Sequence, residues 1–211
     1  MILLVGGQKG GSGKTTLATN LACYLANIGK EIILVDADKQ NSATNWVQDR
    51  LENKTLKNIT SVQVADNIKS SINDLKDKYE NIIIDCAGRD SKEQRTGMLI
   101  ADTFIIPVKP SQYDLDTLDK ISEITENAKD FNPKLKCYIS LSMCPTNPII
   151  NEKQQAESFL KDFPEFKLLS AYTCERKIYR DTVSLGMGVW ESENDKAKLE
   201  IKKIATELFS L

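Results

Sequence analysis

The sequence contains no histidine, which excludes histidine general bases, histidine-based triads and histidine metal ligands. Its formal net charge is only −2, so any nucleic-acid binding would depend on a local basic patch and not on the overall charge. The five cysteines are an odd number and form no C-x-x-C pair. We therefore expect neither a disulfide framework nor a zinc site, and free buried thiols in a reducing compartment fit better.

Long apolar runs are also missing. The opening MILLV is too short for a signal peptide, and no stretch approaches the roughly 18 apolar residues that span a bilayer. We expect a cytoplasmic protein without stable membrane association. With 211 residues and 41% hydrophobic content, one domain over residues 1–211 is the simplest organisation.

Short apolar runs alternate with amphipathic segments along the chain. Near-continuous apolar strands separated by helices predict an α/β fold, with a doubly wound, mostly parallel sheet and helices on both faces. Expected strands lie at residues 1–7, 31–38, 61–66, 81–88, 102–110, 136–143 and 167–172. Expected helices include 14–29, 113–129, 152–161 and two at the C-terminal end. In such sheets ligands bind beyond the carboxyl ends of the strands.

The first expected strand runs into GQKGGSGKT, residues 7–15. We interpret this stretch as a G-x-x-x-x-G-K-T phosphate loop with Gly6 or Gly7 as the leading turn, although a glycine-rich turn that only starts a helix is the alternative. Glycines let the backbone N–H groups surround a phosphate at the helix N-terminus. The expected binding residues are Lys9, Gly10, Gly11, Ser12, Gly13, Lys14, Thr15 and Thr16. Lys14 would reach the β- and γ-phosphates, Thr15 the Mg²⁺ ion and Thr16 the α-phosphate.

Acidic residues follow two other expected strands. Asp36 and Asp38 end one of them, and Asp85 ends another, with Gly88 three residues later. A phosphate loop needs a carboxylate near Mg²⁺ and a group that orients the attacking water. Asp85 matches the Walker B aspartate, and the Gly88 N–H is placed to sense a γ-phosphate and start a switch loop. Each aspartate has a structural alternative as a helix cap or turn residue.

The stretch KGGSGKT resembles the deviant Walker A motif, K-G-G-x-x-K-[ST], of the ParA/MinD family of ATPases. The resemblance implies that Lys9 reaches the ATP of the partner in a nucleotide-sandwich homodimer, while a solvated loop charge is the alternative. It also implies that Asp36 lies near Mg²⁺ and that Asp38 positions the hydrolytic water. The stretches DADKQNSATNW, FIIPVKPSQYDL and SAYTCERKIYRDTVSLGMGVWE are similar to small plasmid-partition ParA proteins, and the last also to VirC1-type proteins.

Two positions depart from the family pattern. Lys39 stands where proline is usual, which loosens the turn after Asp38. The stretch SLSMCPTNP lacks the Asn-Arg signature that often follows this strand. By analogy we expect the loop from Pro110 to Asp114 to line the adenine pocket, with Pro110 among the ATP-binding residues.

The resemblance further implies Mg²⁺-dependent ATP hydrolysis stimulated by a ParB-like partner, and non-specific DNA binding that places the ATP form on the nucleoid. The candidate DNA-binding residues are Arg176, Lys177 and Arg180, which lie within about one helical turn. Lys198, Lys202 and Lys203 on the last helix could join them. A solvated helix face is the alternative.

Three other functions remain in view. A MinD-like ATPase of membrane and cell-division positioning would use the last helix, which has apolar spacing at Leu199, Ile201, Ile204, Leu208 and Phe209; we expect this helix to pack on the sheet instead. An ATP-dependent metabolic ligase would need a substrate pocket. An iron–sulfur electron carrier is disfavoured, because Cys137 and Cys144 flank a late strand.

Overall fold

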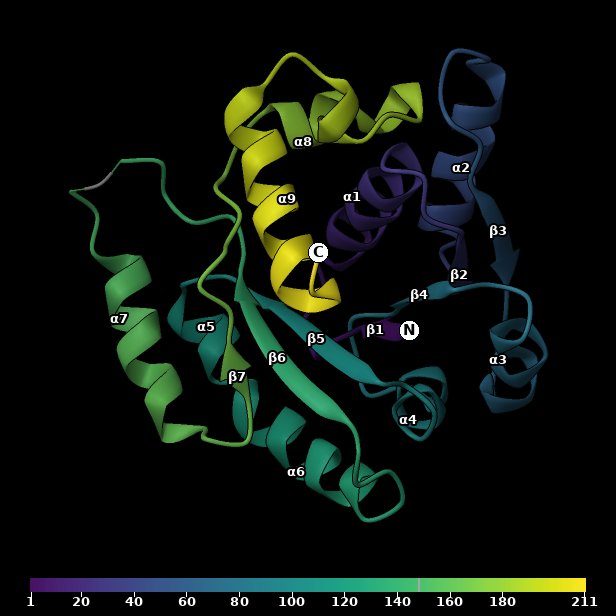
Figure 1. The fold of residues 1–211 in the computed structure, drawn as a ribbon. Coiled ribbons are helices and arrows are strands. Elements are labelled where there is room, and N and C mark those ends of the chain that lie inside the picture. The colour runs from purple at the N-terminus through teal and green to yellow at the C-terminus, as the bar shows by residue number, and fades with distance from the viewer. Residues whose placement is uncertain (148) are drawn as a thin grey trace.

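The computed structural model describes residues 1–147 and 149–211. It has a central sheet with helices packed around it (Figure 1). Its seven described strands run parallel in the order β3-β2-β4-β1-β5-β6-β7. They are β1 (Ile2–Val5), β2 (Ile32–Ala37), β3 (Thr60–Gln63), β4 (Asn81–Cys86), β5 (Thr103–Val108), β6 (Lys136–Leu141) and β7 (Lys167–Leu168). The predicted α/β class and parallel sheet are confirmed.

Helices cover both faces of this sheet, as Figure 1 shows. One face is covered by α1 (Lys14–Asn27), α2 (Ser42–Glu52), α8 (Ile178–Asp181) and α9 (Asp195–Phe209). The other face is covered by α3 (Lys69–Lys76), α4 (Lys92–Met98), α5 (Gln112–Leu115), α6 (Leu118–Lys129) and α7 (Glu152–Phe159). Successive strand residues point to opposite faces, so each apolar strand contributes to two separate cores.

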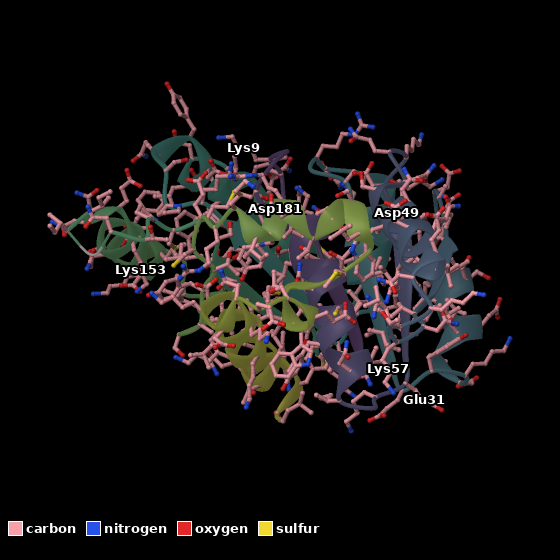
Figure 2. The ribbon with its side chains drawn as sticks, turned by 90° about the horizontal axis from the view of Figure 1, so that it is seen from above. Lys9, Glu31, Asp49, Lys57, Lys153 and Asp181 are labelled. Carbon is pink, nitrogen blue, oxygen red and sulfur yellow. The ribbon has the colours of Figure 1, made fainter. Side chains whose placement is uncertain are left out.

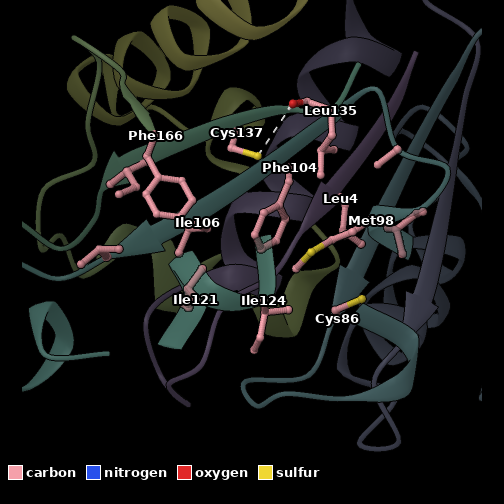
Figure 3. Packing of buried hydrophobic residues seen from close by; sticks show 14 of the residues in the cluster. Leu4, Cys86, Met98, Phe104, Ile106, Ile121, Ile124, Leu135, Cys137 and Phe166 are labelled. Carbon is pink, nitrogen blue, oxygen red and sulfur yellow. Dashed lines mark hydrogen bonds between the residues drawn. The ribbon is translucent and has the colours of Figure 1, made fainter. Parts of the chain in front are cut away.

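The core under α4 and α6 illustrates this arrangement (Figure 3). Leu4 of β1 and Phe104 of β5 are fully buried there, beside Met98 of α4 and Ile121 and Ile124 of α6. On the opposite face, the neighbours of Leu4 along β1 are buried under α1 and α9. Burial on both faces explains why the strands are apolar throughout.

Some predicted elements have different boundaries. The helix expected over 113–129 is interrupted between α5 and α6, at Asp116 and Thr117. The strand expected over 167–172 is regular for only two residues. Of the two helices expected at the C-terminal end, α8 has four residues and α9 has fifteen.

The last helix packs as expected. Ile201, Ile204 and Leu208 of α9 are buried in the core shared with α1. Leu199 is 50% exposed. No helix in the described residues is long and apolar enough to cross a membrane.

Candidate nucleotide-binding site

The connection from β1 to α1 has the backbone of an anion-binding loop. Gly13 precedes the first helical residue with a φ of +90°, a left-handed conformation that favours glycine. No side chain caps the N–H groups of the first turn of α1, so they are free to bind a phosphate. One detail of the prediction is wrong: the position five residues before Gly13 is Gln8, so Gly6 and Gly7 precede the motif.

Beyond the carboxyl ends of the strands lies a hollow of about 470 Å³. The predicted residues that line it are Gly10, Gly11, Gly13, Lys14, Thr15, Thr16, Asp38 and Gly88. Ser12 does not line it: this residue is buried, and its carbonyl accepts a hydrogen bond from Ser142 Oγ at 2.8 Å. That bond fixes the loop against the end of β6.

Lys14 is buried below the loop, and its Nζ donates to the Lys9 carbonyl at 2.6 Å. Burial lowers the pKa of Lys14, and the nearby carboxylates of Asp85 and Asp38 oppose this shift. Gly88 packs directly on this arrangement, because a Cβ there would lie 2.7 Å from both Lys14 Nζ and the Lys9 carbonyl oxygen. The Gly88 loop therefore contacts the phosphate loop without room for a side chain.

Asp85 has the environment of a cation ligand. It is completely buried, and neither carboxylate oxygen has a hydrogen-bond partner. Burial raises the pKa of Asp85 to about 7; Thr15 lies close enough to oppose the rise, although its hydroxyl does not reach hydrogen-bonding geometry. An orphaned buried carboxylate beside a threonine hydroxyl fits a bound Mg²⁺.

Asp36 and Asp38 differ in what their oxygens do. Both oxygens of the buried Asp36 accept backbone N–H groups, from Asp38 at 3.1 Å and Thr44 at 2.8 Å. Asp36 therefore shapes the loop after β2 and does not line the hollow. Asp38 lines the hollow and also accepts the Gln40 N–H at 3.0 Å. It therefore stabilises the turn after β2 and faces the candidate site at the same time.

The described residues contain no group of three or more acidic or cysteine side chains that would hold a metal by themselves. Mg²⁺ usually takes one or two carboxylates together with substrate phosphates and waters. Of the three predicted Mg²⁺ residues, Thr15 and Asp85 fit direct coordination, and Asp36 fits a supporting place.

The second lysine of the motif lies at the rim of the loop, at one edge of the molecule, whereas Glu31, which precedes β2, lies at the opposite edge (Figure 2). Lys9 Nζ is 2.8 Å from Asp114 Oδ2, and the Asp114 carboxylate also accepts Ser111 Oγ at 2.7 Å. The Tyr113 ring centroid is 5.5 Å from the same ammonium group. Lys9 is 39% exposed at its side chain, so it is held in place yet reachable from outside.

A second hollow adjoins the first at Gly13, Thr16 and Met143, which line both. It extends to Leu17, Thr173, Tyr179 and Arg180, a mixture of apolar and polar groups that suits a nucleotide base. Sequence reasoning expected Pro110 at this place. Pro110 is buried at the end of β5 and lines neither hollow, so the loop after β5 serves Lys9 through Asp114.

The three candidate DNA-binding residues have different surroundings. The guanidinium of Arg176 is 2.8 Å from Glu200 of α9, both side chains are largely buried, and Arg176 lines the second hollow. This placement removes Arg176 from the candidate DNA surface. Lys177 and Arg180 are exposed, and each makes one exposed ion pair, with Asp181 at 3.2 Å and Glu175 at 3.7 Å.

The model of the CobQ/CobB/MinD/ParA nucleotide binding domain matches residues 3–141. The chain belongs to this family. Over 212 aligned residues, it is 29% identical to the maintenance of carboxysome distribution protein A of Halothiobacillus neapolitanus, covering 98% of this chain and 95% of that protein. It is 28% identical over 158 residues to the sporulation initiation inhibitor protein Soj of Bacillus subtilis, covering 57% and 62% of the two chains.

Solved structures of the ParA/MinD family share the fold. An ATP complex of a McdA variant from Cyanothece superposes with a TM-score of 0.82 at 14% identity, covering 100% of this chain and 96% of that one. MinD from Aquifex aeolicus superposes with a TM-score of 0.80 at 20% identity, covering 100% of this chain and 97% of that one. The predicted family and the predicted fold class are thereby confirmed, and the curated relatives include proteins named for carboxysome distribution and for chromosome partitioning.

Proposed function

We propose that this protein is a ParA-type ATPase that binds ATP with Mg²⁺, dimerises around it and hydrolyses it slowly. The observation that carries this proposal is the convergence of three groups. The uncapped α1 terminus and the buried Lys14 line one hollow, and the orphaned Asp85 is buried next to Lys14 and Thr15 without lining the hollow itself. The buried lysine and the buried carboxylate lack full charge compensation in the protein alone. A phosphate group and a metal ion supply the missing partners.

In this proposal each group has a separate role. The loop N–H groups and Lys14 bind the phosphates, while Thr15 and Asp85 hold Mg²⁺, which supplies charge neutralisation when it is bound. Asp38 faces the same hollow and orients the attacking water. Asp36 holds the Asp38 backbone through its N–H.

Lys9 points to a dimer. Lys9 does not line the hollow, and its partly exposed ammonium group is paired with Asp114, so it contributes little to the binding of its own nucleotide. We propose that it leaves Asp114 and contacts the phosphates of a second copy. The exposed Tyr113, which is 81% accessible beside Lys9, would then be covered by the partner.

The DNA surface proposed here consists of Lys177 and Arg180 of the α8 region with Lys202 and Lys203 of α9. All four side chains are exposed, and Arg176 joins the two elements through its ion pair with Glu200. Exposed ion pairs contribute about 0–1 kcal/mol, so Lys177 and Arg180 can exchange theirs for phosphate contacts. Two copies double the patch, which makes DNA binding depend on the ATP dimer.

The partner that stimulates hydrolysis and releases the dimer is proposed to be a ParB-like adaptor bound to the cargo. The chain's likeness to relatives named for chromosome partition and for carboxysome distribution supports a cargo-positioning cycle common to both. The ligase alternative is less favoured, since one nucleotide accounts for both of the hollows described above.

The proposal is tested by the mass of the protein in solution, measured by light scattering with ATP, with ADP and without nucleotide. A dimer that forms only with ATP and Mg²⁺, and that Lys9→Ala weakens, is the expected result. A monomer in all three conditions would contradict the dimer, and failure of wild-type protein to bind ATP would contradict the whole assignment. Lys57→Ala, a change of an exposed lysine at the opposite edge of the molecule (Figure 2), is the matched control.

A further inference from the structure

Two cationic side chains line the phosphate hollow but have no role in the proposed function. Lys39 lies in the loop after β2 and Arg89 in the loop after β4, and both line the hollow with exposed side chains. In the described part of the chain, neither makes an ion pair within 4.0 Å. Their charge is therefore available to a ligand.

The backbone on either side of each cation is fixed. Lys39 stands inside a tight turn in which the carboxylate of Asp38 accepts the Gln40 N–H at 3.0 Å, and the Asp38 carbonyl accepts the Asn41 N–H at 2.9 Å. This turn forms although lysine replaces the proline usual in the small ParA proteins. The sequence change therefore adds a charge at the rim without removing the turn.

Arg89 is anchored on both sides as well. The preceding Gly88 packs on Lys14 and on the phosphate loop. The N–H of the following Asp90 donates to Gln8 Oε1 at 3.1 Å, and the Asp90 carboxylate is held by Arg95 through two contacts of 2.6 Å. Asp90 is thus engaged with Arg95, and Arg89 has no ion-pair partner among residues 1–147 and 149–211.

The positions of the two hollows determine how a bound nucleotide is oriented. They meet at Gly13, Thr16 and Met143, and the one suited to a base extends from there toward Tyr179 and Arg180. A nucleotide with its base at that end has its last phosphate at the other, where Asp38, Lys39, Gly88 and Arg89 lie. ATP and ADP differ only at this end.

The other two lysines at the phosphate loop have different tasks in the proposed function: Lys9 acts across the dimer, and Lys14 binds the phosphates of ATP and ADP alike. Lys9 is paired with Asp114 at 2.8 Å, and Lys14 Nζ donates to the Lys9 carbonyl. We propose that Lys39 and Arg89 bind the terminal phosphate group from two sides and give a single protomer its preference for ATP over ADP. This inference rests on the proposed function of the hollow as an ATP site. Hydrogen bonds to charged groups are the stronger ones in proteins, so two of them produce a selectivity that can be measured.

The test compares the dissociation constants of ATP and ADP with Mg²⁺ for wild type and Lys39→Ala/Arg89→Ala, by calorimetry at several protein concentrations. We expect ATP binding to weaken about tenfold or more, while ADP binding changes less than about twofold. The preference for ATP over ADP should decrease by the same factor when both substitutions are made in the Lys9→Ala protein, since a contact within one protomer does not need the partner's lysine. The charge-retaining Lys39→Arg/Arg89→Lys protein should keep the preference for ATP.

The matched control is Lys69→Ala/Lys76→Ala, which removes the same charge from exposed positions on α3. An unchanged ATP-to-ADP ratio in the Lys39→Ala/Arg89→Ala protein would overturn the inference. An equal loss of affinity for ATP and ADP would also overturn it. Such a loss would mean that the two positive charges attract any nucleotide and do not contact the last phosphate. If wild-type protein binds neither nucleotide, the proposed function fails and not this assignment alone.

Discussion

Arg50→Met should destabilise the protein in a way that depends on pH. Arg50 of α2 is buried, and its guanidinium contacts both oxygens of Glu191, at 2.6 and 2.8 Å. It also donates to the carbonyls of Lys57 at 2.7 Å and Gly186 at 2.9 Å. Methionine replaces the apolar stem of the arginine, but it leaves the Glu191 carboxylate, whose side chain is 9% exposed, without its cation.

The size of the effect follows from what remains around Glu191. Removing one partner of a buried ion pair costs about 3–5 kcal/mol. The carboxylate keeps the Asn27 amide at 2.8 Å and the Gly188 N–H at 3.1 Å, which places the expected loss near 3 kcal/mol. For a chain of this size, that is a decrease in melting temperature of about 6–12 °C.

The pH dependence has a definite sign. Burial acts to raise the pKa of Glu191, but the hydrogen bonds from Arg50 and Asn27 outweigh it and hold that pKa below the ordinary value of 4.5. In wild type the group therefore stabilises the fold above pH 4.5, and this stability is lost on acidification below that value. Without Arg50, burial prevails and the pKa rises above 4.5. The penalty in Arg50→Met should then shrink as the pH falls from 7 to 5.

Urea unfolding of wild type and Arg50→Met at pH 7 and pH 5 measures both effects. Arg50→Met/Glu191→Gln, which removes the orphaned charge, should regain part of the stability at pH 7 and lose the pH dependence of the penalty. A penalty under 1 kcal/mol, or one that grows on acidification, would refute this reasoning.

The remaining predictions concern the site. Lys14→Ala should abolish detectable nucleotide binding by calorimetry, since the buried cation of the loop is gone; unchanged affinity would refute the site assignment. Lys9→Ala should bind ATP normally but hydrolyse it at least tenfold more slowly, and wild-type turnover would remove its role across the dimer. Asp38→Ala should bind ATP and turn it over slowly, whereas normal turnover would leave Asp38 only its turn role. Asp85→Asn should raise the stability of the nucleotide-free protein by about 1–3 kcal/mol in urea unfolding, because a buried unpaired charge is replaced by a neutral amide of the same shape, and ATP with Mg²⁺ should no longer stabilise it.

The phosphate loop and the sheet could be predicted because their signals are local. Gly13, Lys14 and Thr15 lie together in the sequence between an apolar run and a helix, and Asp85 directly follows buried strand residues. Parallel strands bring such neighbours to one edge. The strand expected over residues 167–172 is longer than the observed β7, because an extended apolar segment has the same sequence pattern whether or not all of it pairs with a neighbouring strand.

Contacts between distant segments could not be predicted in the same way. The Lys9–Asp114 pair joins residues 105 positions apart, and the aspartate gives no local sign of its partner. Arg50 looks like a solvated charge on an amphipathic helix, yet it is buried against Glu191. Arg176 looks like part of a basic surface, but Glu200 of α9 binds it in a largely buried ion pair. Each of these pairings depends on how helices pack, and helical spacing alone does not determine that.

The measurement that tests the central claim most directly is binding to non-specific double-stranded DNA with ATP, with ADP and without nucleotide, at low and moderate salt. Binding only with ATP, steeply weakened by salt, is the predicted result, because a dimer would place two sets of lysine and arginine contacts on the phosphate backbone. Lys177→Ala/Lys202→Ala, which changes two exposed lysines that line neither nucleotide hollow, should weaken it without changing ATP binding. Equal binding in all nucleotide states, or none in any state while the ATP dimer forms, would contradict the account.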